Sequence, residues 1–353
     1  MKRKLAFLLM LCFGWSFFLN GCGGTLPKTD DRLQVVCTIF PEYDWARQLT
    51  QGVDNVDLTL LVKNGTDLHS YQPSVRDIAM IARADVFCYV GGVSDTWVNN
   101  VLDTTENRTA QLVSMAEAAD ADEEVLAEGM QAEHEHEHEH EHDHHDDESD
   151  SHEEPPELDE HVWLSLRRAA LACTAMKEAL CKADPAHEDI YNQNCTDYLQ
   201  KLQELDSDFT EMTSQAARDT IVVADRFPFR YLAEDYGLTY YAAFPGCSAE
   251  TEASFETIVF LSEKVKSLHL PCVLVTEGSN SSLAKTILEN AGSDGKILTL
   301  QSLQAVSQKE IDTGVTYLSK MQENYDVLKQ ALNSRGGVKI YGTTHWKRCH
   351  IGL

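Results

Sequence analysis

The sequence lacks the short motifs that mark the commonest catalytic sites. It contains no HExxH, no GxSxG, no Walker loop and no GxGxxG after a strand-like run. It also has no CxxC pair, and the spacings of its ten cysteines match no zinc ribbon. Cys37, Cys88 and Cys272 lie within apolar runs, where a thiol behaves as a small hydrophobic group, so we assign no disulfide. We therefore expect a protein without enzymatic activity.

Long apolar runs are scarce as well, and the main one lies at the start of the chain. The positive residues Lys2–Lys4 precede an apolar run, Leu5–Leu19, that is short for a membrane span. Leu19–Cys22 (LNGC) then resembles a bacterial lipobox. We expect residues 1–21 to be a signal peptide, Cys22 to be lipidated, and residues 22–32 to form a flexible tether at the extracytoplasmic face of the cell membrane. A plain signal peptide or a short membrane anchor is the alternative.

Basic residues are few, so the net charge is -28, and many of the acidic residues lie in one segment. Of the 57 acidic residues, 21 lie between Glu117 and Glu160. Such a surface repels nucleic acid phosphates and attracts divalent cations, so we expect no nucleic-acid binding. Eight of the fourteen histidines lie in the same segment, between His134 and His152.

This acidic His-rich segment alternates imidazoles with carboxylates, which are ligands for divalent transition metals. It has nothing to bury, so we expect residues 119–158 to be a disordered loop. The loop is interpreted as an auxiliary collector of metal, and a plain solvated spacer is the alternative. The histidines assigned to auxiliary capture are His134, His136, His138, His140, His142, His144 and His145.

Outside this segment, short apolar runs alternate with segments of helical periodicity, which predicts two α/β lobes with mostly parallel sheets. The expected strands are 34–40, 56–62, 86–90, 111–114, 220–224, 238–243, 271–276 and 297–300. The expected helices are 43–50, 74–83, 94–102, 160–183 with Asp159 as N-cap, 186–217, 229–236, 252–268, 282–291 and 310–332. The predicted divisions are a lobe at 33–118, the loop at 119–158, a linking helix at 159–183, a lobe at 184–332 and an atypical tail at 333–353.

Two histidines outside the loop stand out by their positions. His69 follows a predicted strand, at the end of the strand where ligand sites form in α/β proteins. His161 opens the predicted linking helix. Judged from composition alone, a histidine in either position is more often a hydrogen-bonded polar residue than a metal ligand. A cleft between the lobes is the default binding site.

Several blocks, in order, are similar to the zinc/manganese solute-binding lipoproteins of ABC transporters. Gly65–Ser74 (GTDLHSYQPS) is similar to the G-x-x-x-H-x-[YF]-x-P-[ST] motif of that family, and Asp159–Leu164 (DEHVWL) to D-x-H-x-W-L. The resemblance covers about residues 33 to 332, and an acidic His-rich insertion is a feature of the zinc-type members. Further matching blocks are Ala84–Gly92, Tyr231 with Tyr236–Leu238, and Ser254 with Val273–Glu277.

The resemblance implies two lobes joined by a long rigid helix, with a metal held in the cleft between them. It also implies that His69 and His161 are metal ligands, and neutral imidazoles suit zinc. The chain departs from the family at the third ligand position, where Arg226 stands, because a guanidinium cannot coordinate a cation. The fourth position falls at or near Gln301.

We expect Glu277 to replace a missing ligand, with Arg226 paired to one of the carboxylates of Glu277, Glu250 and Glu252. A role for Glu277 as a helix cap or backbone partner remains open for that residue. The other candidate ligands are Asp225, Glu250 and Glu252.

The function that these features predict is that of a lipid-anchored, monomeric receptor that delivers zinc to an ABC permease and its cytoplasmic ATPase. Zinc is preferred over manganese because manganese favours carboxylate-rich ligand sets. The alternatives are a manganese receptor of the same family, a surface metal-binding or adhesin-like protein without transport, and a metal-dependent hydrolase.

Overall fold

The computed structural model describes residues 32–63, 65–105, 109–130, 158–248 and 252–334. From Leu33 on, these residues belong to one compact unit. Within the described ranges, no helix has both the length and the apolar character needed to cross a membrane. The predicted signal peptide, Cys22, the histidines of the loop from His134 to His145 and nearly all of the tail lie outside the described residues.

The first lobe is built on a four-stranded parallel sheet in the order β2-β1-β3-β4. Ser74 is the N-cap of α3 and forms a capping box with Asp77, in which each side chain accepts from the other residue's backbone N–H. The strands are β1 (Leu33–Cys37), β2 (Val56–Leu60), β3 (Val86–Tyr89) and β4 (Gln111–Ser114). The helices are α2 (Phe40–Leu49), α3 (Val75–Ile81), α4 (Trp97–Thr104) and α5 (Met115–Ala118), with 3-10 turns η1 (Leu68–Ser70) and η2 (Val93–Asp95).

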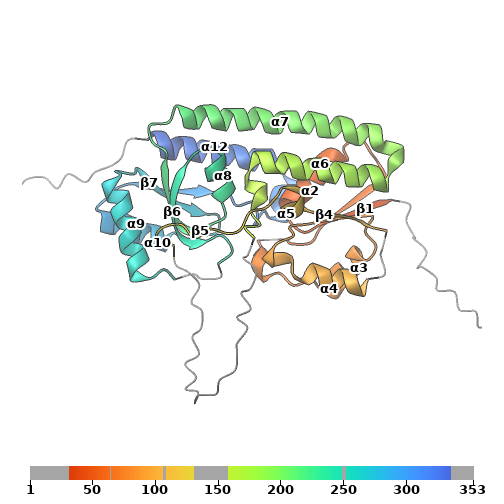
Figure 1. The fold of residues 1–353 in the computed structure, drawn as a ribbon, viewed down its shortest axis with the longest axis horizontal. Helices are drawn as coiled ribbons and strands as arrows, with labels where there is room; N and C mark the ends of the chain where they lie inside the picture. The colour runs from red at the N-terminus through yellow and green to blue at the C-terminus, as the bar shows by residue number, and fades with distance from the viewer. Residues whose placement is uncertain (1–31, 64, 106–108, 131–157, 249–251, 335–353) are drawn as a thin grey trace, which may run out of the picture. The chain divides into compact units, whose positions relative to one another are not determined.

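The second lobe repeats this plan with a parallel sheet in the order β6-β5-β7-β8. The strands are β5 (Thr220–Phe227), β6 (Thr239–Pro245), β7 (Cys272–Thr276) and β8 (Lys296–Leu300). The helices are α8 (Arg230–Asp235), α9 (Phe255–Ser267), α10 (Ser282–Ala291), α11 (Gln308–Asp312) and α12 (Tyr317–Asn333). The two sheets confirm the predicted fold class (Figure 1).

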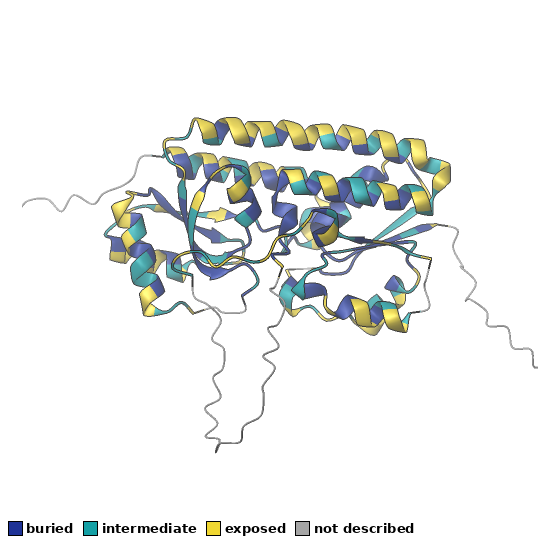
Figure 2. Cartoon of the chain, viewed as in Figure 1, coloured by how far each residue is buried: buried dark blue, intermediate teal, exposed yellow. Residues whose placement is uncertain are grey.

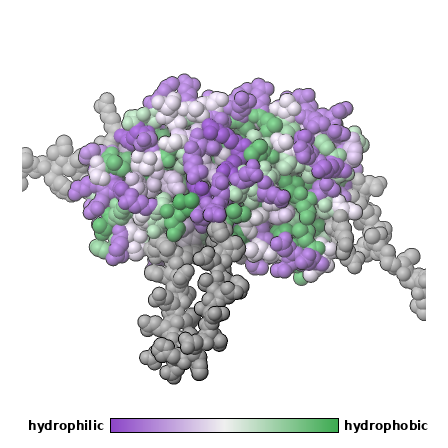
Figure 3. All heavy atoms as spheres, in the orientation of Figure 1, coloured by the Kyte–Doolittle hydropathy of each residue, from purple (hydrophilic) through white to green (hydrophobic). Residues whose placement is uncertain are grey.

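A long helix, α7 (Glu188–Ser214), lies across both lobes (Figure 1). Its buried residues recur every three or four positions, which places them on one face: Tyr191, Cys195, Tyr198, Leu202, Leu205, Phe209 and Met212. The opposite face is exposed and mainly hydrophilic (Figures 2 and 3). The predicted linking helix at 159–183 corresponds to α6 (Leu166–Ala183), which packs against α7 and against β3 and β4 of the first sheet.

The lobes share one apolar core, which contains residues of both sheets and of α6, α7 and α12. Trp163, in the 3-10 turn η3 (Val162–Leu164), connects the parts of this core. Its indole N–H donates to the backbone oxygen of Ser302 at 2.8 Å, and its own backbone oxygen accepts from the hydroxyl of Tyr317 at 2.6 Å. Asp44 of α2 accepts from the backbone N–H of Tyr317 at 2.7 Å. The second lobe is therefore tied to the first by hydrogen bonds that lie in the shared core.

Two predicted helices differ from those in the structure. The helix predicted to begin near Glu160 begins at Leu166, because Ser165 is its N-cap and the Asp159 carboxylate is engaged by His161 instead. The single helix predicted for 310–332 is two helices, α11 and α12. Gly314 interrupts it with a φ of 92°, a left-handed conformation that few residues other than glycine adopt.

The described residues on the two sides of the His-rich segment, Asp122–Glu123 and Leu158–Asp159, lie beside each other. Glu123 and Leu158 form an isolated antiparallel bridge, and the backbone N–H of Asp159 donates to the oxygen of Asp122 at 2.9 Å. Tyr231 of α8 accepts from the N–H of Asp122 at 2.9 Å. The base of the segment is therefore part of the fold and leads directly to His161.

Candidate metal centre

His69 is positioned by the turn that follows β2. Asp67 caps this turn: one oxygen of its carboxylate accepts from the backbone N–H of His69 at 3.0 Å. The other oxygen pairs with Arg226 of the second lobe, at 2.9 Å from Nη2. The cap fixes the His69 backbone, and the ion pair connects it to the opposite lobe.

His161 is fully buried and is positioned by Asp159. One carboxylate oxygen of Asp159 lies 3.1 Å from the His161 backbone nitrogen and 2.9 Å from its Nδ1. The carboxylate accepts a hydrogen bond from the N–H at Nδ1, and in the neutral imidazole this leaves the lone pair on Nε2. This carboxylate–imidazole pairing is the usual way in which proteins orient a metal-binding histidine.

Ser94 and Glu160 orient the imidazole of His69. The Nδ1 of His69 lies 2.7 Å from the hydroxyl oxygen of Ser94, and that hydroxyl also bonds to the Glu160 carboxylate. Because an ionised carboxylate accepts only, the hydroxyl donates to Glu160 and accepts from His69. The backbone N–H of Ser94 donates to the second oxygen of Glu160 at 3.0 Å, which fixes the chain of contacts. The lone pair of His69 therefore also lies on Nε2.

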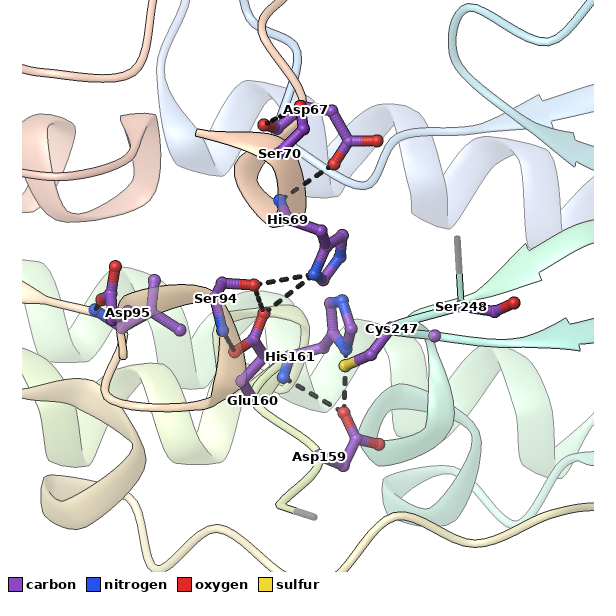
Figure 4. Close-up of polar contacts among 12 residues, drawn as sticks. Asp67, His69, Ser70, Ser94, Asp95, Asp159, Glu160, His161, Cys247 and Ser248 are labelled. Carbon is purple, nitrogen blue, oxygen red and sulfur yellow. Dashed lines mark hydrogen bonds and ion pairs between the residues drawn. The ribbon is translucent and has the colours of Figure 1, made fainter. Parts of the chain in front are cut away.

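The two Nε2 atoms are buried and have no hydrogen-bond partner among the described residues. Buried polar atoms are nearly always paired, so two orphaned nitrogens in one place call for a ligand. The rings of His69 and His161 face one another with centroids 5.6 Å apart, and the sulfur of Cys247 lies beside them (Figure 4). Ligand atoms of His69, Glu160, His161 and Cys247 all lie within 4.8 Å of one another.

The pKa values of three titratable groups in this cluster are shifted. Burial, together with the neighbouring His161, lowers the pKa of His69 to about 4, so this imidazole is neutral near pH 7. Burial would lower the pKa of His161, but the hydrogen bond and charge of Asp159 raise it above its ordinary value. Burial raises the pKa of Glu160. His69 is therefore a neutral imidazole near pH 7, and His161 is an imidazole that is hydrogen-bonded to the Asp159 carboxylate.

The structure brings His69 and His161 together, but Glu277 lies outside this group. The Glu277 carboxylate accepts from the backbone N–H and the hydroxyl of Ser302, each at 2.6 Å. It therefore has the role of backbone partner that the sequence left open. Arg226 pairs with Asp67, whereas the sequence predicted a pair with Glu277, Glu250 or Glu252; of these, Glu250 lies outside the described residues.

The other candidate ligands have partners or positions of their own. Asp225 accepts from the backbone N–H and hydroxyl of Thr276, and the backbone of Gln301 bonds to the side chain of Asn324. Glu252 is exposed, and Glu250 lies outside the described residues.

Sequence reasoning missed Cys247, Glu160 and Ser94 as members of the site. Cys247 follows β6 directly, at the same end of a parallel strand that drew attention to His69. Applying that rule to every strand would have found it. Glu160 and Ser94 gave no signal, because their role depends on contact between segments 66 residues apart.

A family model described as zinc-uptake complex component A, periplasmic, matches residues 35–331. The chain belongs to this family. The resemblance seen in the sequence is thereby confirmed.

Two curated relatives illustrate the similarity. The zinc-binding lipoprotein AdcA of Streptococcus pneumoniae strain R6 is 31% identical over 336 residues, which are 95% of this chain and 62% of AdcA. The high-affinity zinc uptake system protein ZnuA of Bacillus subtilis strain 168 is 30% identical over 331 residues, 92% of this chain and 96% of that protein. The chain therefore spans less than two thirds of the AdcA proteins and nearly all of the Bacillus protein.

Solved structures share the fold. The Zn(II)-bound ZnuA-like domain of Streptococcus pneumoniae AdcA is 29% identical, with a TM-score of 0.65 over 86% of this chain and 100% of that domain. The periplasmic zinc-binding protein TroA of Treponema pallidum has a TM-score of 0.67 at 22% identity, over 86% of this chain and 100% of TroA. The TroA likeness concerns the fold alone.

Proposed function

We propose that this protein is an extracytoplasmic zinc receptor that delivers the ion to an ABC importer. The observation that carries the proposal is the pair of buried Nε2 atoms of His69 and His161, each with its Nδ1 already bonded and its lone pair directed into the same space. Imidazole nitrogens bind zinc at about 2.0–2.1 Å, so one ion between these rings would satisfy both.

Zinc is the proposed cargo because of the imidazole pair and the relatives. The relatives named above are described as zinc-binding or zinc-uptake proteins, and one similar domain was solved with Zn(II) bound. Glu277 as a further ligand remains a prediction, and it would require this carboxylate to leave Ser302. The protein performs no bond chemistry in this proposal: it binds the ion and releases it to a permease, which a cytoplasmic ATPase drives.

The test is calorimetric titration of zinc into the protein from about Asp30 onward, with and without residues 133–152. One tight site should survive deletion of the His-rich segment and should be lost in His69→Ala and in His161→Ala. The matched control is His187→Ala, since His187 bonds to Asp184 away from the site and its loss should leave affinity unchanged. A protein without the segment that binds no zinc tightly would contradict the receptor function and favour a surface metal-binding protein.

The proposed location depends on Cys22. We propose that this residue is lipidated and holds a monomeric receptor at the outer face of the cell membrane. Cys22→Ala should move the protein from the membrane fraction to the soluble fraction, while zinc binding is retained. A variant that stays in the membrane fraction would instead favour an uncleaved apolar anchor.

The His-rich segment is proposed to collect zinc for the tight site. Stopped-flow measurements at scarce zinc should show slower capture after deletion of residues 133–152. Equal capture rates would favour a solvated spacer.

A further inference from the structure

The site has no third imidazole at the position where its family places one. Arg226 stands there, and a guanidinium stays protonated and cannot bind a cation. Its charge is already paired with Asp67. The second lobe must therefore supply a ligand from another segment if it is to close on the ion.

We propose that Cys247 is this ligand and that its thiolate closes the second-lobe side of the zinc site. This inference rests on the proposed function and names one more residue of the same site. Two independent observations point to it: the sulfur lies within 4.8 Å of a ligand atom of each of His69, Glu160 and His161, and both histidines have a buried Nε2 without a hydrogen-bond partner among the described residues.

The distances fit a tetrahedral ion after a small contraction. Bonds of about 2.0–2.1 Å to nitrogen and about 2.3 Å to sulfur place neighbouring ligand atoms about 3.3–3.8 Å apart. Atoms that lie 4.8 Å apart would therefore approach by about 1.0–1.5 Å on binding.

The backbone before Cys247 is held in a position that presents the sulfur to the site. Glu124 accepts from the backbone N–H of Gly246 at 3.0 Å and of Cys247 at 3.3 Å. Gly246 packs directly against His161, since a Cβ there would lie 2.8 Å from Cε1 of that ring. Arg226 reaches the backbone oxygen of Ser248 at 3.5 Å, on the other side of the cysteine. The segment is therefore fixed on both sides of the sulfur.

Negative charge also gathers around the site. The Glu160 carboxylate belongs to the group, Asp159 bonds to His161 and Glu124 accepts from the backbone of Cys247, so a thiolate would add to the negative charge that faces Zn²⁺. Glu160 is itself fixed by Ser94 and by the close backbone of Gly92, where a Cβ would lie 2.2 Å from a carboxylate oxygen. On binding, the metal–sulfur bond forms as the S–H bond breaks, and the proton leaves to the solvent.

A thiolate changes which ions the site accepts. Sulfur is a soft ligand that favours zinc and cadmium and disfavours manganese, which prefers oxygen. The site should therefore bind Zn²⁺ and Cd²⁺ well and Mn²⁺ poorly.

The experiment uses the full chain in detergent, loaded with Co²⁺ as a coloured stand-in for zinc. A thiolate bound to Co²⁺ gives a sulfur-to-metal charge-transfer band in the near ultraviolet. The band should be present in the unaltered protein and absent in Cys247→Ser. Cys181→Ser is the matched control, because Cys181 is a partly exposed free thiol on α6 outside the site, and the band should remain. Residues 133–152 contain neither cysteine nor methionine and add no such band.

A second variant separates ligation from folding. Cys247→His replaces the thiolate by an imidazole, so it should bind zinc more tightly than Cys247→Ser does, by at least tenfold, without the charge-transfer band. A band that persists in Cys247→Ser, or one that is absent from protein with bound Co²⁺, overturns the role of Cys247 and leaves the receptor function standing. Failure of the unaltered protein to bind Co²⁺ or Zn²⁺ at the tight site overturns both.

Discussion

The Arg226 guanidinium and the Asp67 carboxylate form an ion pair between the two lobes, with Nη2 and Oδ2 2.9 Å apart. Partial burial would raise the pKa of Asp67, but the charge and hydrogen bond of Arg226 lower it below its usual value. Asp67 also caps His69, so the same carboxylate fixes one proposed ligand and joins the lobe that carries it to the other lobe. The ion pair therefore joins the two lobes directly beside the proposed ligand His69.

This ion pair should slow the release of zinc. In Arg226→Gln and in Asp67→Asn, we expect zinc to dissociate several-fold faster, because each change removes the pair that joins the lobes. The double variant should release zinc no faster than the faster single variant, since both changes remove one interaction. Stopped-flow transfer of zinc to a chelator measures the rate.

The control for this prediction is Arg167→Gln, whose ion pairs with Asp206 and Asp235 lie away from the site. Its release rate should be unchanged. Fully additive effects of the two site variants would show that Asp67 and Arg226 act separately.

Any side chain at position 246 should lower the affinity for zinc. An alanine Cβ would lie 2.8 Å from Cε1 of His161 and 3.2 Å from the backbone oxygen of Phe227, so the imidazole must shift. Misplacing a ligand in this way is expected to weaken zinc binding about 10–100-fold, as losses of orienting groups do. Competition with a chelator of known affinity measures the change.

Gly295→Ala is the control for steric crowding. A Cβ there would meet the backbone oxygen of Pro271 at 2.9 Å, a similar clash far from the ligands. It should lower the stability of the second lobe and leave zinc affinity unchanged. Equal loss of affinity in both variants would mean that crowding acts through general destabilisation.

The hydroxyl of Tyr317 should contribute to stability through its bond to Trp163. Tyr317→Phe leaves the buried backbone oxygen of Trp163 without this donor, which is expected to lower the free energy of unfolding by about 1–3 kcal/mol. Tyr198→Phe is the matched control, because the buried hydroxyl of Tyr198 has no partner among the described residues, and its removal should cost little. Urea denaturation of the two metal-free variants distinguishes them, and equal losses would argue against the Trp163 bond.

Glu42 should make the first lobe less stable as pH rises. Burial, with the charge of Asp95, raises the pKa of Glu42 to about 8, well above its value in the unfolded chain. Between about pH 5 and pH 8 the folded state therefore holds a proton that the unfolded state releases, and stability falls by up to about 1.4 kcal/mol per pH unit. Glu42→Gln removes this proton while its amide keeps a partner in Thr38.

Denaturation of the metal-free proteins at several pH values tests whether the free energy of unfolding falls as pH rises. The difference in unfolding free energy should grow in favour of Glu42→Gln from pH 5 to pH 8. A difference that is constant with pH would show that Glu42 is ionised in the folded protein throughout.

Sequence periodicity predicted the strands well, because parallel buried strands are short, apolar and bounded by turn residues. Gln111–Ser114 was predicted to the residue, and most other ends differ by a few positions. The helix starts were less predictable where an acidic residue had two possible roles. Asp159 looks like an N-cap, but its carboxylate orients His161, and that preference depends on a buried imidazole that no local pattern reveals.

The candidate site was predictable in part. His69 and His161 were found from motif position, and the structure brings them together. Cys247 was not found, because the rule that ligand sites form at strand ends was applied to His69 and not to the end of β6. The partnership arises when β6 is placed in the second sheet, beside the segment that holds His161.

The bridge between Glu123 and Leu158 closes the base of the His-rich segment before the chain reaches the site. Insertions or deletions within residues 131–157 are therefore expected to leave the positions of His69 and His161 unchanged. In the proposal that the segment collects zinc, the number of its histidines can then vary without altering the tight site.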